Sequence, residues 1–173
     1  MMRALVAYES MFGNTQIIAE AIAEGLSERM DVEALEVGAA PTRIDDVAIL
    51  ILGGPTHTFG LTRPGTRQDA ARQATQGLVS RGLGLREWLT SLEGPAGAAA
   101  AFDTRIAKPH LPGSAARVAE KRLRRLGFRI VAPAESFYVE GSLGPLQAGE
   151  RERARRWGQT LGSTIADPRH AKR

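Results

Sequence analysis

The residues best suited to chemistry are two hydroxyl side chains and a glycine near the start of the chain. Ser10 and Thr15 flank Gly13, at the point where an apolar run ends and helical spacing of apolar residues begins. The first N–H groups of a helix have no carbonyl partners within it, and its dipole adds about half a positive charge. Gly13 lets the backbone approach an oxyanion because it has no Cβ. This pattern predicts an anion site, with an ordinary strand-to-helix turn capped by Ser10 or Asn14 as the alternative.

The glycine spacing narrows the class of anion. The turn has neither the Gly-Lys-Ser/Thr of nucleoside-triphosphate loops nor the Gly-x-Gly-x-x-Gly of dinucleotide sites. ATP, GTP and NAD are therefore disfavoured, and a monophosphate is favoured. A serine hydrolase is disfavoured too, because Ser10 lacks a Gly-x-Ser-x-Gly elbow.

Residues 8–15, Tyr-Glu-Ser-Met-Phe-Gly-Asn-Thr, resemble the FMN phosphate loop of the flavodoxin family, usually written Ser/Thr-x-Thr-Gly-x-Thr. Phe12 stands where many members have a threonine that binds the phosphate. A hydrogen bond to a charged group contributes about 1.5–3 kcal/mol, so its loss weakens binding about ten- to a hundred-fold unless backbone N–H groups compensate. The resemblance implies phosphate contacts from Ser10, Met11, Phe12, Gly13, Asn14 and Thr15.

Two later loops extend the resemblance. Residues 53–60, Gly-Gly-Pro-Thr-His-Thr-Phe-Gly, follow a second buried run and resemble the loop that wraps one side of the flavin ring. This implies ring contacts from Pro55, Thr56, His57, Thr58, Phe59 and Gly60. The position of the loop after residues 97–103 in the same fold implies the opposite wall, with Asp103, Thr104, Arg105 and His110.

A metal or acid–base site is the alternative for part of this set. His57, His110 and Asp103 all lie on loops at one edge of the expected sheet, and histidine and carboxylate are common zinc ligands. Nothing in their spacing requires convergence, so we expect no metal site and no catalytic residue.

Apolar runs and helical stripes alternate along the chain. We expect strands at 3–9, 31–37, 47–53, 97–103 and, in two pieces, 129–133 and 136–140, with helices at 14–29, within 67–93, at 114–126 and at 147–166. Such alternation predicts an α/β fold in three layers, with a parallel sheet between helices. The resemblance implies five strands in the order 2-1-3-4-5, a switch-point topology of which flavodoxin is a known example.

A receiver domain shares that strand order and is excluded by its chemistry. It needs an acceptor aspartate at the end of the third strand, where this chain has Leu52-Gly53-Gly54.

The whole chain fits one domain. It has 173 residues, 43% of them hydrophobic and 24% charged. We assign residues 1–166 to the domain and 167–173 to a basic tail. No apolar run approaches the roughly 20 residues of a membrane span. Because the first strand starts almost at once, we expect no leader and a cytoplasmic location. The chain has no cysteine, so redox chemistry would belong to a bound cofactor.

The charge balance bears on partners. The net charge is +4, and the isoelectric point is near 10.1. A basic electron carrier should prefer partners with acidic docking faces. Glutamates interrupt the basic runs and no aromatics interleave with them, so we expect no nucleic-acid partner. The three clusters are Lys121, Arg122, Arg124 and Arg125; Arg151, Arg153, Arg155 and Arg156; and Arg169, Lys172 and Arg173.

The resemblance implies an FMN-binding electron-transfer protein that shuttles electrons between a reductase and an acceptor. Two alternatives stay open. One is an FMN-dependent reductase of a quinone or another small acceptor. The other is a non-redox binding module of the same fold whose affinity for FMN is weak or lost.

Overall fold

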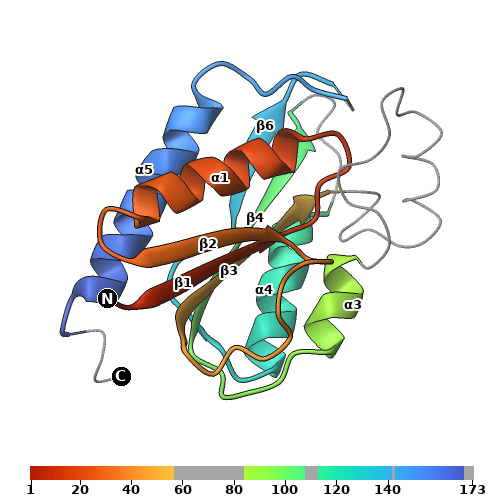
Figure 1. Ribbon diagram of the computed structural model, residues 1–173. Helices are drawn as coiled ribbons and strands as arrows, with labels where there is room; N and C mark the ends of the chain where they lie inside the picture. Colours follow the sequence, from red (N-terminus) through yellow and green to blue (C-terminus); the bar gives the residue numbers. More distant parts are fainter. Residues whose placement is uncertain (57–83, 108–112, 142, 170–173) are drawn as a thin grey trace.

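A computed structural model describes residues 1–56, 84–107, 113–141 and 143–169 (Figure 1). Residues 67–83 of the predicted helical region lie outside that part. The strands are β1 (Arg3–Tyr8), β2 (Asp31–Glu36), β3 (Val47–Pro55), β4 (Ala98–Ile106), β5 (Arg129–Ile130) and β6 (Glu135–Val139). The helices are α1 (Asn14–Leu26), α3 (Leu85–Thr90), α4 (Ala115–Arg125) and α5 (Glu150–Ala166).

The strands form one parallel sheet in the order β2-β1-β3-β4-β5, with β6 also paired to β4. This confirms the predicted α/β fold and its strand order. The fifth position is divided, because β5 pairs with Ala98 and Ala99 and β6 pairs with residues 102–106 of the same strand. Pro133 lies between the two pieces and has no N–H to donate to a ladder.

Helices cover both faces of the sheet. Figure 1 shows α1 and α5 on one face and α3 and α4 on the other. Alternate residues of β1 belong to two separate cores: Val6 packs under α1 and α5, while Leu5 and Ala7 pack under α3 and α4. All three side chains are buried, as expected for a central strand covered on both sides.

Two glycines allow α1 and α5 to pack closely. A Cβ on Gly25 would lie 2.0 Å from the carbonyl oxygen of Arg155, and one on Gly158 would lie 2.2 Å from that of Ile22. The two helix backbones are therefore in direct contact, and only glycine fits at either position.

The tryptophans behave as the apolar stripes predict. Trp88 of α3 is fully buried, and the half-buried Trp157 of α5 packs edge-on against Phe102 and Phe137, with ring centroids 6.4 and 6.1 Å away. Both are core residues.

Element ends differ from the predicted ones. β4 continues to Ile106 because β6 pairs with that extension. α5 begins at Glu150 instead of residue 147, since the N–H of Gln147 still donates to the carbonyl of Tyr138. Among the described residues, no helix combines the length and apolar character that a membrane span requires.

Candidate functional site

The turn between β1 and α1 is built around Ser10 and Gly13. Gly13 has φ 92° and ψ −13°, in the left-handed region that glycine tolerates best. Ser10 is fully buried, and its Oγ accepts hydrogen bonds from the N–H of Gly13 at 3.1 Å and of Gln16 at 3.2 Å. Ser10 therefore shapes the turn and caps the helix at once.

Other N–H groups of this turn are available to an anion. The first hydrogen bond within α1 runs from the N–H of Ile17 to the carbonyl of Gly13. Within the described part of the chain, no acceptor is found for the N–H groups of Met11, Phe12, Asn14 and Thr15. Several backbone donors thus lie together at the positive end of a helix dipole.

The side chains of the turn lie in three environments. Met11 is buried, whereas Phe12 is half-buried. Asn14 donates from its amide to the carbonyl of Leu143 at 3.3 Å, which ties the turn to the loop after β6. The β1–α1 turn therefore contacts a segment 129 residues further along the chain.

Thr15 is joined to Thr104 on β4. Their hydroxyl oxygens lie 2.7 Å apart, and both side chains are buried. One hydroxyl hydrogen is used in this contact, and the other is left over because each hydroxyl carries one. Thr104, which the resemblance places beside the ring, thus also lies next to the β1–α1 turn.

Asp103 organises the opposite side of the edge. It is fully buried, and its Oδ2 accepts from Thr56 Oγ1 at 3.0 Å, Ser114 Oγ at 2.6 Å and the N–H of Ala116 at 3.1 Å. The hydroxyl of Thr56 accepts in turn from the N–H of Ala115 at 3.0 Å. These bonds provide acceptors within the protein for the N–H groups of Ala115 and Ala116 at the start of α4. They also join α4 to the ends of β3 and β4.

The remaining predicted ring residues are only partly described. Pro55 ends β3 and is half-buried, and Arg105 donates to the carbonyl of Gly113 at 2.8 Å. His57, Thr58, Phe59, Gly60 and His110 lie outside the described residues, so their predicted contacts stay predictions. Among the described residues, no group of histidine, cysteine and acidic side chains is arranged to hold a metal ion.

The structure adds a residue that the sequence analysis did not single out. Glu9 follows β1 directly and is 1% exposed, and its Oε2 accepts from the N–H of Leu85 at 3.0 Å, at the start of α3. Its own N–H donates to the carbonyl of Gly53. A carboxylate directly after a buried apolar strand was the available signal, since such a group needs a partner inside the protein.

These contacts gather the carboxyl ends of β1, β3 and β4 at one edge of the sheet. Ser10 and Thr15 lie on the α1 side, and Thr56 and Asp103 lie on the α4 side. The chain leaves β1 toward one face of the sheet, while α3, the next described helix after β3, covers the other (Figure 1). Such a switch point is where open α/β sheets bind ligands.

Comparison with known proteins supports the fold. No protein-family model and no curated protein matches the sequence. Among solved structures, a flavodoxin from the domain Archaea is similar over 96% of this chain and 100% of its own, with a TM-score of 0.67 and 18% identity. Flavodoxin 1 from Bacillus cereus gives a TM-score of 0.64 and 19% identity, over 94% of this chain and 96% of its own.

A larger protein contains a similar part. The rubredoxin oxygen:oxidoreductase of Desulfovibrio gigas matches 94% of this chain, with a TM-score of 0.61 and 19% identity. This chain covers 36% of that protein. The similarity of fold thus extends to part of a much longer protein as well as to chains of similar length.

Proposed function

We propose that this chain, whose fold is that of the flavodoxins, binds FMN non-covalently and carries electrons between a reductase and an acceptor. The observation that carries the proposal is the β1–α1 turn. There a left-handed Gly13 lies at the switch point of the sheet with backbone N–H groups that have no acceptor in the described part of the chain. The flavodoxins among the similar structures support the same conclusion.

The residues of the turn fit a phosphate monoester. The N–H groups of Phe12, Asn14 and Thr15 can donate hydrogen bonds to phosphate oxygens. The Thr15–Thr104 pair can donate one more, from the hydroxyl hydrogen that their own contact does not use. Backbone donors thus compensate for the hydroxyl that Phe12 does not supply. FMN bound there would supply the redox chemistry, since the chain has no cysteine of its own.

For the ring we propose the two loops that follow β3 and β4. Pro55 and residues 56–60 form one wall, and Asp103, Thr104, Arg105 and His110 belong to the other. Asp103 and Thr56 would act mainly by holding both loops to the start of α4. Their hydrogen bonds would position the ring contacts without requiring either side chain to touch the ring.

The proposed partners are redox proteins with acidic docking faces, and the proposed location is the cytoplasm. Electron transfer at an exposed ring edge needs no general acid, so the protein's work is binding and positioning. We therefore favour a carrier over a stand-alone oxidoreductase.

One observation favours a second candidate, a non-redox binding module with weak FMN affinity. The Oγ of Ser10 already accepts two N–H groups, and the hydroxyl of Thr15 already has Thr104 as its partner. If these hydroxyls serve only the protein, the backbone alone holds the phosphate.

Titration of the cofactor-free protein with FMN, followed by quenching of flavin fluorescence, tests the proposal. We expect saturable binding in the micromolar range or tighter, and no saturation up to about 1 mM FMN would reject it. The Gly13→Ala variant should weaken binding about tenfold or more, because a Cβ strains the left-handed turn and crowds the anion.

Gly149→Ala is the matched control. Gly149 also precedes a helix with a left-handed φ of 85°, but no atom lies within 4 Å of where its Cβ would be. Both variants introduce similar backbone strain. Only Gly13→Ala should change the affinity for FMN. Equal losses of affinity in both variants would mean that backbone strain lowers the stability of the protein and that Gly13 has no specific role in binding.

A further inference from the structure

The basic clusters of the sequence have different surroundings in the structure. On α5, Arg151 pairs with Glu24 at 3.0 Å, and Arg153 pairs with Glu135 at 2.6 Å and Glu150 at 2.7 Å. Further along, Arg155 pairs with Glu152 and Glu28, and Arg169 with Asp167. Neighbouring carboxylates therefore neutralise most of the charge of the α5 cluster.

The cluster on α4 is not neutralised in this way. Five of the eleven residues of α4 are basic and one is acidic. That acid, Glu120, pairs with Arg124 at 2.8 Å and also accepts from the N–H of Ala134. In the described part of the chain, no ion pair is found for five cations that we call the α4 basic face: Arg117, Lys121, Arg122, Arg125 and Arg129.

Helix stability accounts for only part of this arrangement. Arg122 and Arg125 lie in the last turn of α4, where cations interact favourably with the helix dipole. Arg117 lies in the first turn, at the positive end of the dipole. Arg117, Lys121 and Arg125 also follow one another at intervals of four residues, so their like charges repel. The position of Arg117 and the four-residue spacing of like charges both lower the stability of the helix. Helix stability therefore does not explain these cations, which points to a role of their charge in binding.

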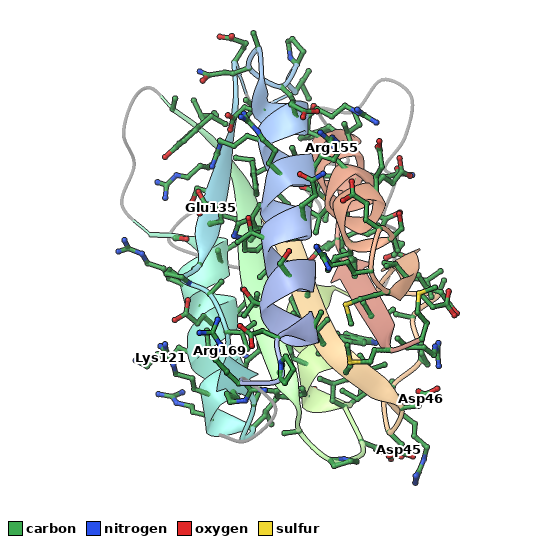
Figure 2. The ribbon with its side chains drawn as sticks, turned by 90° about the vertical axis from the view of Figure 1, so that its left-hand side faces the viewer. Asp45, Asp46, Lys121, Glu135, Arg155 and Arg169 are labelled. Atoms are coloured by element: carbon green, nitrogen blue, oxygen red, sulfur yellow. The ribbon has the colours of Figure 1, made fainter. Side chains whose placement is uncertain are left out.

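Four of the five cations are exposed and Arg122 is half-buried, and the Arg117 end of the face adjoins the candidate site. Figure 2 shows Lys121 projecting away from the body of the protein beside α4. The residue before the helix, Ser114, donates to Asp103 at the carboxyl edge of β4, so Arg117 lies within one turn of that network. Leu126 at the other end of the helix is 47% exposed, a large apolar side chain among cations.

We propose that the α4 basic face is a docking surface for an acidic protein. Arginine guanidinium groups pair with carboxylates in a planar, two-bonded geometry, and four of the five cations are arginines. Leu126 supplies an apolar contact bordered by charge, as in protein interfaces. α4 carries no aromatic side chain on which nucleic-acid bases could stack, and one exposed leucine is too little to insert into a membrane.

That the docked protein is a redox partner rests on the proposed function. That an acidic protein binds to the α4 basic face does not depend on it. The position of Arg117 near the carboxyl edge would bring such a partner close to the proposed ring. Binding is therefore measured on the protein without cofactor, so that failure of the FMN titration and failure of docking are separate results.

The test uses poly-L-glutamate as the acidic probe, with amide chemical shifts of the isotope-labelled protein as the readout. We expect the shifts to be confined to residues 115–130. The triple variant R117Q/K121Q/R125Q should weaken binding about tenfold, because three charge contacts are lost. R29Q/R43Q/R156Q removes three exposed arginines elsewhere and should weaken it less than about twofold.

Four results would overturn the proposal. Shifts that spread over several faces, or equal losses in both triple variants, would mean that only net charge attracts the probe. Tighter binding of duplex DNA than of poly-L-glutamate at about 0.15 M salt, through the same residues, would assign the face to nucleic acid. Tighter binding of vesicles rich in phosphatidylserine would assign it to a membrane surface. Unchanged amide spectra of α1 and α5 in the variants verify that the fold is intact.

Discussion

The buried hydroxyl pair of Thr15 and Thr104 is the side-chain contact that joins the candidate phosphate loop to β4. Replacing Thr15 by valine leaves the hydroxyl of Thr104 buried without this partner. Such an orphan costs about 1–3 kcal/mol. We expect Thr15→Val to lower the free energy of unfolding by about that amount, as measured by urea denaturation of the cofactor-free protein.

The double variant Thr15→Val/Thr104→Val isolates the contact. With both hydroxyls replaced by methyl groups of the same shape, no orphan is left, so the double variant should be more stable than the sum of the single effects implies. Additive losses would show that the 2.7 Å contact contributes nothing of its own.

Local sequence indicated Thr15 as part of the turn but did not indicate that Thr104 is its partner. Ser10, Gly13 and Thr15 lie within six residues, so strand, turn and helix signals together indicated the loop. Thr104 lies 89 residues away from Thr15, and no local pattern shows which threonine of a strand end faces a helix start. The partners of Asp103 were missed for the same reason, because they come from the end of β3 and the start of α4.

The crossing of α1 and α5 gives a sharp test of helix packing. Because a Cβ on Gly158 would lie 2.2 Å from the backbone of Ile22, Gly158→Ala must push the helices apart. We expect a loss of about 1–3 kcal/mol in the free energy of unfolding. Chemical denaturation measures it.

Gly162→Ala is the control on the same helix. A Cβ there would contact only side-chain atoms at 3.8 Å, so it fits without displacement. Since alanine favours helix over glycine by about 1 kcal/mol, this variant should be unchanged or slightly more stable. Similar losses in both variants would contradict close packing at Gly158.

The start of α5 predicts a dependence of stability on pH. The hydrogen bond from Arg153 lowers the pKa of Glu150, and the N–H of Tyr138 lowers it further, against the opposing effect of partial burial. A lowered pKa means that the carboxylate stabilises the fold above its unfolded pKa of about 4.3, and that this stabilisation is lost as the pH falls through the folded value.

Glu150→Gln should therefore be less stable than the original chain at pH 7, by about 1 kcal/mol after allowance for the partly exposed Arg153. The difference should shrink as the pH falls below about 4.3 and disappear once Glu150 is protonated in the folded protein too. Thermal unfolding at several pH values measures it. The exposed pair of Glu152 and Arg155 offers Glu152→Gln as a control with a smaller expected change. A difference that persists at low pH would contradict the role of the charge.

The order of elements was predictable where each has its own apolar pattern. β1, β3 and the alanine-rich β4 were found as strands, and the stripe that includes Trp157 and Leu161 indicated α5. The ends were not predictable, because they depend on pairing with distant strands. β4 is extended by its contact with β6, and the segment before α5 is held by Tyr138.

For the molecule as a whole, composition predicted a net positive charge without showing which surface carries it. Sequence shows three similar basic clusters. Only tertiary structure brings Glu24, Glu28 and Glu135 to the arginines of α5. Among the described residues, it leaves most of the arginines of α4 without an acidic partner. The +4 net charge therefore describes an uneven surface, and partner binding should depend on α4 more than on total charge.

The central claim is that the start of α1 holds the phosphate of FMN, and the ratio of the dissociation constants for riboflavin and FMN tests it most directly. Riboflavin has the same ring and ribityl chain but no phosphate. If the backbone N–H groups of Met11, Phe12, Asn14 and Thr15 hold the phosphate, FMN should bind at least about a hundredfold more tightly than riboflavin, because several charge-assisted hydrogen bonds would be lost with the phosphate. Equal affinities, or no binding of either, would contradict the claim.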